Sequence, residues 1–262
     1  MGFWTWDSGR SLFHWLKILL DIIVLMIDSN QNLNSKEKIM KFPGGKGGNY
    51  QKYINLMPPH EIYIESHLGG GAIMRYKRKA KRNIGIEIDP EVVEIWNNRD
   101  QVNFELINGD AITFLKSYPF TGKELVYCDP PYIRETRKKY YPIYKYEYSL
   151  TQHVELLEVI KSIPCMVMIS GYESPLYTKS LKNWNTHSFQ AKTHHGMATE
   201  WIWFNYPPPV QLHDYRYLGD TFREREKIKR KSKRWTTKFK SMPVLERQAL
   251  LSALQAANDE NY

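Results

Sequence analysis

The stretch from Leu125 to Tyr132 constrains the fold more than any other part of the chain. An apolar run, Leu125 to Cys128, stops at a carboxylate, two prolines and a tyrosine. The run has the length of a buried strand and is too short for a helix. Neither proline can donate a hydrogen bond to a sheet, and each holds the preceding residue extended. The pattern therefore predicts a strand that ends at Asp129, at the edge of an open α/β sheet where ligands bind.

Tyr132 adds a flat ring beside this acceptor. A planar ligand with an amino group suits the pair, because the ring can stack on the ligand while the carboxylate and the next carbonyl accept its N–H groups. A plain strand followed by a Pro-Pro turn is the alternative interpretation, and the rest of a nucleotide-type site must decide between the two.

Three further predicted strands end in carboxylates. The strand that begins at Ile62 ends at Glu65, the strand over 83–89 ends with Glu87 and Asp89, and the strand over 103–108 is followed by Asp110. One such acid alone would indicate a helix cap or a solvated turn. Three acids at the ends of successive strands, followed by Asp129, favour a single cleft. Such a cleft would suit a ligand with hydroxyls, an adenine and a positive centre.

Two segments rich in glycine lie on either side of the first strand. Gly69–Gly71 joins this strand to a helix predicted over 72–81, and it approximates the turn at which α/β folds hold a nucleotide against the backbone. Phe42 to Gly48 places Lys46 among glycines, but it has neither the spacing nor the Ser or Thr of a phosphate-binding P-loop. Taken alone, this second segment predicts a flexible turn.

Composition limits the class of protein. The length of 262 residues suits one α/β domain with an appendage, and the net charge of +9 suggests a polyanionic partner such as nucleic acid. Cys128 and Cys165 lie in apolar, strand-like runs, which indicates buried thiols in a reducing compartment. His194 and His195 have no further ligand at metal spacing, so no metal site is predicted.

Residues 1–39 fit the rest of the chain poorly. Leu12 to Ile27 is strongly apolar, but Lys17 and Asp21 interrupt it, and it is shorter than the ~20 residues of a membrane-spanning helix. We interpret residues 1–39 as a non-essential extension of a cytoplasmic protein whose main α/β domain covers 40–206. A membrane anchor is the alternative.

After Tyr132 the chain first becomes basic and then apolar. Residues 134–148 interleave five Lys or Arg with five Tyr, which suits nucleic-acid binding and a solvated loop equally well. A helix is predicted over 150–162. Strands are predicted over 165–170, 184–190 and 201–206, of which the last two form an antiparallel pair.

Pro207 to Pro209 marks a boundary, and residues 207–262 are predicted to form a basic helical segment. One helix is expected over 221–235 and another over 243–257. The charges of this segment either contact nucleic-acid phosphates or solvate an exposed helix. The candidate nucleic-acid-binding residues of both basic segments are Arg134, Arg137, Lys138, Lys139, Arg223, Lys229, Arg230 and Lys231.

The order of these parts over residues 40–206 resembles the DNA adenine methylase family of DNA adenine-N6 methyltransferases. Asp129-Pro130-Pro131-Tyr132 matches the family's catalytic motif, with Asp in the first position as in adenine-specific enzymes. The resemblance implies an α/β, Rossmann-like seven-stranded S-adenosylmethionine-dependent methyltransferase fold, with S-adenosylmethionine as cofactor and double-stranded DNA as partner. The implied catalytic residues are Asp129, Pro130, Pro131 and Tyr132, and the implied cofactor-binding residues are Phe42, Gly45, Lys46, Glu65, Gly69, Gly71, Glu87, Asp110 and Asp129.

The chain departs from the better-known family members in one respect. Only residues 111–127 separate Asp110 from the catalytic motif Asp129 to Tyr132, which leaves no room for their long target-recognition insert. The basic C-terminal segment resembles the tails of shorter, phage-type relatives instead. The resemblance implies direct methyl transfer to an adenine flipped out of the duplex.

Other functions remain as alternatives. They are methylation of cytosine N4, of RNA adenine or of protein glutamine, a non-catalytic DNA-binding protein with this core, and a nicotinamide oxidoreductase. Asp129 argues against glutamine and cytosine, the filled motif positions argue against a non-catalytic protein, and the poor dinucleotide fingerprint argues against an oxidoreductase.

Overall fold

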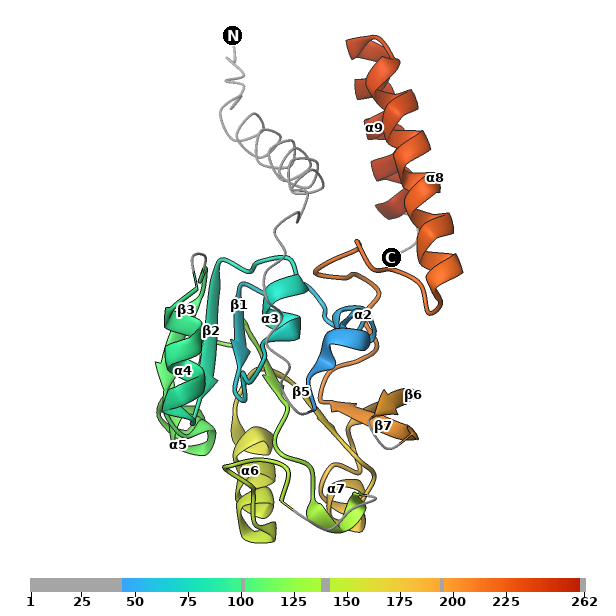
Figure 1. Ribbon diagram of the computed structural model, residues 1–262. Coiled ribbons are helices and arrows are strands. Elements are labelled where there is room, and N and C mark those ends of the chain that lie inside the picture. The colour runs from blue at the N-terminus through green and yellow to red at the C-terminus, as the bar shows by residue number, and fades with distance from the viewer. Residues whose placement is uncertain (1–43, 100–101, 138–141, 194–195, 260–262) are drawn as a thin grey trace, which may run out of the picture. The chain divides into compact units, whose positions relative to one another are not determined.

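Residues 44–99, 102–137, 142–193 and 196–259 are described by the computed structural model (Figure 1). The predicted N-terminal extension and Phe42 lie outside these ranges, as do Lys138, Lys139 and the pair His194–His195.

The described residues build a seven-stranded sheet in the order β3-β2-β1-β4-β5-β7-β6. The first five strands in this order are parallel, whereas β7 runs antiparallel to both β5 and β6. This topology confirms the predicted α/β, seven-stranded Rossmann-like class. The strands are β1 (Ile62–Glu65), β2 (Arg82–Glu87), β3 (Glu105–Asn108), β4 (Glu124–Cys128), β5 (Met166–Gly171), β6 (Asn185–Thr193) and β7 (Gly196–Phe204).

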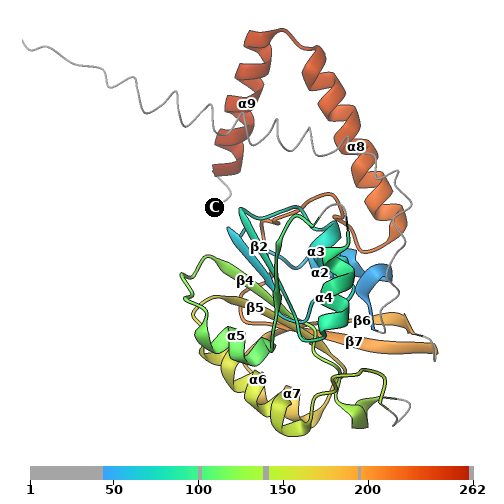
Figure 2. The ribbon, with the colours of Figure 1, turned by 60° about the vertical axis from the view of Figure 1, so that its left-hand side comes forward.

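Helices cover both faces of the sheet, which is why the central strands are apolar on both sides (Figure 2). In β4, for example, Leu125 and Val126 point to opposite faces and both are fully buried. One face packs against α5 (Ala111–Ser117), α6 (Leu150–Ser162) and α7 (Pro175–Ser180), and the other lies under α2 (Tyr50–Ile54), α3 (Ala72–Tyr76) and α4 (Pro90–Asn97). Two short 3-10 turns are also present, η2 (Lys46–Gly48) and η3 (Arg134–Thr136).

Helix boundaries agree with the sequence prediction where local caps set them. α6 has the predicted bounds, because Ser149 and Gln152 form a capping box at its start. The predicted helix over 72–81 instead ends at Tyr76. There Lys77 turns to an extended conformation, and its buried ammonium lies 4.2 Å from the ring centroid of Tyr63.

The predicted antiparallel pair is confirmed as β6 and β7, although both strands reach further toward their shared turn than the prediction had. Polar residues at that end of the hairpin are exposed, so no apolar pattern marks it in the sequence. Cys128 is buried at the end of β4. Cys165 lies just before β5 and is only half-buried, a correction to its predicted place inside that strand, and both thiols are free.

The chain after β7 returns to the core before it reaches the basic helices. The His213 N–H donates to the Met57 carbonyl at 2.9 Å, and the buried Asp214 carboxylate accepts from the Arg78 N–H at 2.9 Å. Asp214 also pairs with Arg216 at 2.7 Å. These contacts fix residues 212–216 against the segments that flank α2 and α3.

Two helices end the described chain. α8 (Phe222–Ser241) starts at a capping box of Thr221 and Glu224 and continues past Trp235, where the prediction ended it. α9 (Val244–Asp259) diverges from it after the Met242–Pro243 connection (Figure 2). No residue of α8 is buried. None of the helices in the described ranges combines the length and the hydropathy of a membrane-spanning segment.

Candidate active site

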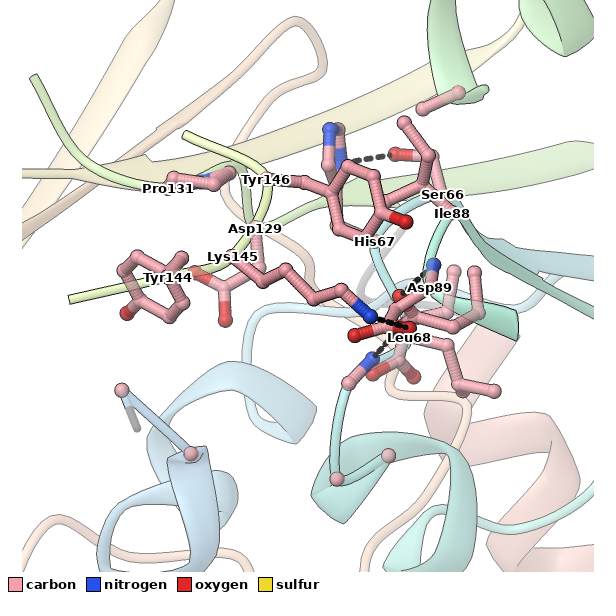
Figure 3. A pocket seen from close by; sticks show the side chains of 18 of the residues that line it. Ser66, His67, Leu68, Ile88, Asp89, Asp129, Pro131, Tyr144, Lys145 and Tyr146 are labelled. Atoms are coloured by element: carbon pink, nitrogen blue, oxygen red, sulfur yellow. Dashed lines mark hydrogen bonds and ion pairs between the residues drawn. The ribbon is translucent and has the colours of Figure 1, made fainter. Parts of the chain in front are cut away.

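The carboxyl ends of β1, β2, β3 and β4 open into one pocket (Figure 3). Glu65, Glu87, Asp110 and Asp129 all line it, so the four strand-end carboxylates predicted to share a cleft do so. The other predicted site residues that line the pocket are Gly45, Lys46, Gly69, Gly71 and Pro131.

The glycine loop after β1 forms one wall of this pocket. Gly71 has φ +55°, and a Cβ at this position would lie 2.7 Å from the Trp96 ring. A side chain would therefore be strained by the backbone and would also collide with the ring. The Gly69 carbonyl accepts from Trp96 Nε1 at 2.9 Å, and the Gly69 N–H donates to Glu87 at 2.8 Å. The loop is thus held close to the sheet and presents backbone to the pocket.

Glu65 is the most deeply buried of the four acids, with a relative exposure of 3%. Its Oε2 accepts from the Tyr63 hydroxyl at 3.0 Å and from the Met74 N–H at 2.9 Å. Burial raises the pKa of Glu65 to about 8, although these hydrogen bonds favour the anion. A cation brought into the pocket would convert this carboxyl to its charged form.

Glu87 and Asp110 lie further along the pocket. Glu87 accepts from the N–H groups of Gly69 and Asp89, at 2.8 and 2.9 Å, and burial raises its pKa. These two bonds fix the carboxylate in one orientation. Asp110 caps α5 by accepting from the Thr113 N–H at 2.8 Å, so the same residue is both a helix cap and a pocket wall.

Lys46 lies against the motif at residues 129–132. Its Nζ is 2.8 Å from Asp129 Oδ1 and 2.8 Å from the Tyr132 hydroxyl, and the side chain is only 7% exposed. Burial opposes the ammonium, but the carboxylates of Asp129 and Glu200 outweigh it, so the pKa of Lys46 lies well above its usual value. The lysine among glycines is therefore an ordered cation beside Asp129, where the segment taken alone predicts a flexible turn.

Asp129 is held from two sides. Besides Lys46, the Ser170 hydroxyl on β5 donates to Oδ1 at 2.8 Å, and β4 and β5 are paired immediately before it. Burial raises the pKa of Asp129, and Lys46 offsets part of this effect. The second oxygen, Oδ2, accepts no hydrogen bond from any residue in the described ranges.

The other three residues of the motif, Pro130 to Tyr132, are packed to different depths beside Asp129. Pro130 is buried, whereas Pro131 and Tyr132 are half-buried. The Tyr132 ring meets the Tyr172 ring edge-on, with centroids 4.8 Å apart. Its hydroxyl donates to Glu200 on β7.

Glu200 has no place in the motifs recognised from sequence. Its carboxylate lies 3.0 Å from Lys46 Nζ, and both side chains are 7% exposed. It precedes Trp201 to Phe204, the apolar part of β7. The sequence did contain one signal for Glu200: it is an acid directly before an apolar strand segment. Acidic side chains are rarely buried unless they are paired, so an acid in this position predicts a buried partner.

Residues 142–148, in the tyrosine-rich segment after the motif, are half-buried or exposed, and several of them bind protein side chains. Lys145 pairs with Asp89 at 3.2 Å and with Glu91 at 2.9 Å, and the Tyr148 hydroxyl lies 3.0 Å from His67 Nε2. These bonds hold residues 143–148 along the pocket wall.

The predicted DNA-binding residues are divided by the structure. Arg137 is buried and its guanidinium binds Glu147 and the Tyr132 carbonyl, so it does not lie on a surface that DNA could reach. Arg134 is exposed. On α8, the four predicted residues are all exposed: Arg223, Lys229, Arg230 and Lys231. Within the described ranges, no group of three or more His, Cys, Asp or Glu side chains is placed to hold a metal ion.

A family model, D12 class N6 adenine-specific DNA methyltransferase, matches residues 98–195. This range contains Asp110 and the motif Asp129 to Tyr132, and the match confirms the resemblance seen in the sequence. It supports methyl transfer as the chemistry of the chain. No curated protein sequence matches significantly.

The chain is also similar to solved structures. TrmK of M. capricolum, in complex with S-adenosyl-homocysteine, has 8% identity and a TM-score of 0.42 over 80% of this chain and 95% of its own. The putative methyltransferase yhhF of Escherichia coli has 16% identity and a TM-score of 0.38, over 60% of this chain and 80% of its own. SMU.1697c, a putative methyltransferase of Streptococcus mutans in complex with SAH, has 10% identity and a TM-score of 0.39, over 59% of this chain and 93% of its own.

Proposed function

We propose that the protein transfers a methyl group from S-adenosylmethionine to the N6 amino group of adenine in DNA. The observation that carries the proposal is the state of Asp129. One of its oxygens is held by Lys46 and Ser170, and the other accepts no hydrogen bond from a described residue at the edge of an acid-lined pocket. A carboxylate fixed in this way is ready to accept a hydrogen bond from an amino group.

The pocket fits the proposed cofactor. Glu87 is oriented by two N–H groups and has lone pairs left for ribose hydroxyls, and Asp110 lies at the next strand end. Gly69 to Gly71 lets a ligand approach the backbone, while Glu65 offers a partner for the cationic methionine end. When bound, S-adenosylmethionine supplies an electrophilic methyl group.

The target base meets the other end of the pocket. A base inside a duplex cannot reach Asp129, so the adenine is flipped out of the helix. Asp129 Oδ2 and the Pro130 carbonyl accept from its amino group, which raises electron density on N6, and Tyr132 provides a stacking surface. Lys46 and Ser170 hold the carboxylate in position, so catalysis rests on alignment and electrostatics and needs no covalent intermediate.

The first experiment measures transfer of labelled methyl groups to DNA, RNA and protein in parallel, followed by nucleoside analysis. We expect N6-methyladenine in DNA. Asp129→Ala should abolish transfer while cofactor affinity stays within a few-fold of the wild type, because the residue faces the base. Asp129→Asn should retain little activity. N4-methylcytosine as the product, or methylated RNA alone, would refute the assignment of the substrate.

The basic helix α8 is the best candidate for contacts to DNA phosphates. It carries ten Lys or Arg and two Glu over its length, and it buries none of them. In contrast, Arg137 and Lys145 of the first basic segment already bind protein carboxylates. Phosphate contacts from α8 would position the duplex without reading its sequence.

A salt series tests this role of α8. Each neutralised phosphate steepens the log–log dependence of DNA affinity on salt by about 0.9, so Lys229→Ala, Arg230→Ala and Lys231→Ala together should flatten it by up to about three. Cofactor affinity should not change. The matched control replaces three exposed lysines elsewhere, Lys81, Lys123 and Lys161, and should keep the wild-type slope. Identical slopes for both triple variants would mean that these α8 charges do not contact DNA.

A further inference from the structure

We propose that Glu200 is a positioning residue for methyl transfer, acting through Lys46 on Asp129 and directly on Tyr132. This inference rests on the proposed function, and it extends the catalytic centre to a strand that the family match does not reach: the match ends at residue 195.

The geometry joins four side chains into one cluster, in which Lys46 and Glu200 are buried and Asp129 and Tyr132 are partly buried. Lys46 Nζ lies 2.8 Å from Asp129 and 3.0 Å from Glu200, and 2.8 Å from the Tyr132 hydroxyl. The same hydroxyl donates to Glu200, so the cluster is closed. The backbone places Glu200 here because β7 pairs with β5, whose Ser170 also binds Asp129.

The charges of this cluster favour a role in the reaction. With Asp129 alone, the Lys46 ammonium would form a one-to-one pair and neutralise the carboxylate that accepts from the target. Glu200 provides a second anion, so that one cation serves two carboxylates and the cluster keeps one net negative charge. This charge lies where the target nitrogen becomes cationic as it gains a methyl group, and opposite charges at short range attract strongly in a buried site.

The second effect of Glu200 is on Tyr132. A tyrosine ring that stacks on a base must keep one plane, and a hydrogen bond from the hydroxyl to a fixed carboxylate restrains it. Glu200 is itself fixed by Lys46, so the stacking surface and the acceptor share one anchor.

Folding alone does not account for the cluster. A buried ion pair costs desolvation free energy, and apolar residues of similar size often stabilise a protein as well or better. Ile202, Trp203 and Phe204 show that β7 accepts apolar side chains next to this position.

Glu200→Gln is the informative variant, because it removes the charge and keeps the shape and an acceptor oxygen. Methyl transfer to DNA is measured in single turnover across pH, and cofactor affinity is measured by calorimetry. We expect the rate to fall at least about tenfold, the change expected when a positioned electrostatic contact worth about 1.4 kcal/mol is lost. Cofactor affinity should change less than about twofold.

The pH profile separates an electrostatic role from a structural one. Transfer requires ionised Asp129, and Glu200 raises the pKa of that carboxyl, so its removal should move the acid limb of the profile to lower pH. Five tyrosines also face the cluster, and all keep their protons in this range because burial raises their pKa values: Tyr53, Tyr127, Tyr132, Tyr144 and Tyr172. Glu65 also faces Asp129, but burial raises its pKa to about 8, so it titrates on the alkaline side of the profile.

Two further variants complete the design. Glu200→Asp keeps the charge, so the acid limb of its pH profile should stay in place while the rate of methyl transfer falls. If Glu200→Gln does not fold, Glu200→Asp is used to test the inference instead. Thr199→Ala, beside Glu200 on the exposed face of the hairpin, should match the wild type.

The outcomes distinguish the inference from the function beneath it. Wild-type protein that methylates no DNA overturns the proposed function, and the inference with it. Wild-type methylation with an unchanged rate and acid limb in Glu200→Gln overturns the inference alone. If Glu200→Gln does not fold, the inference is overturned when the acid limb of the Glu200→Asp profile is displaced from that of the wild type.

Discussion

Glu65 should make the stability of the free protein depend on pH in a predictable way. Its pKa is raised from an ordinary 4.5 to about 8 in the folded protein because the carboxyl is buried. A carboxyl with a raised folded pKa contributes stability that is complete below pH 4.5 and is lost as the pH rises through 8. The folded state must either hold the proton or bury a charge.

The magnitude follows from the size of this change. Each pH unit between the two values costs the folded state about 1.4 kcal/mol relative to the unfolded chain, or about 5 kcal/mol over the whole interval from 4.5 to about 8. Glu65→Gln removes this contribution and keeps an acceptor for the Tyr63 hydroxyl and the Met74 N–H. The variant should therefore gain stability relative to the wild type as the pH rises from 5 to 8.

Urea unfolding at several pH values, followed by circular dichroism, measures the difference between the two proteins. Taking the difference cancels the buried histidines, whose contributions are common to both. Glu94→Gln, at an exposed position on α4, controls for the loss of a carboxylate as such. Stability curves for wild type and Glu65→Gln that run parallel from pH 5 to 8 would refute the reasoning.

Four further predictions concern the proposed cofactor pocket and the contacts of residues 212–216. Cofactor binding at pH 7 should release about one proton from wild type and none from Glu65→Gln, as measured by calorimetry in buffers of different ionisation enthalpy; equal release would exclude Glu65 as the partner of the cationic end. Glu87→Ala should weaken cofactor binding by ten- to a hundred-fold, because a hydrogen bond to a charged group contributes about 1.5–3 kcal/mol, and an unchanged affinity would rule out its ribose contact. Gly71→Ala should lower the melting temperature by several degrees and weaken cofactor binding, since its Cβ would collide with Trp96; wild-type values for both would show that the loop can move. Asp214→Ala should cost about 1–3 kcal/mol in urea unfolding, because it leaves the Arg78 N–H unpaired, and a change below about 0.5 kcal/mol would show that residues 212–216 are not held by this contact.

The sequence was most informative where chemistry and local geometry coincide. The apolar run before Asp129 and the two prolines after it suffice to place that carboxylate at a sheet edge. The acids that end β1 and β2 and the acid that follows β3 converge for the same reason: carboxyl ends of parallel strands meet on one side of a sheet. The cap formed by Ser149 likewise sets the start of α6.

Contacts between distant segments could not be predicted in this way. Lys46 reads as part of a flexible turn until the fold brings it against Asp129, and Glu200 becomes visible only through the register of β7 on β5. Arg134 and Arg137 lie in the same basic, tyrosine-rich segment, yet Arg137 is buried because it pairs with Glu147. Such outcomes depend on which partner the tertiary structure supplies, and no local pattern encodes the partner.

The position of β7 in the chain has a consequence for protein synthesis. Lys46 enters the folding domain near its start and Glu200 near its end, and the sheet holds them together only after β7 has paired with β5. A polypeptide that stops short of β7, through a premature stop codon or a stalled ribosome, carries the glycine loop and the motif at Asp129 but leaves the Lys46 ammonium bound to one carboxylate. Incomplete chains therefore lack the full cluster of Lys46, Asp129, Tyr132 and Glu200, whose assembly depends on the last strand to join β5.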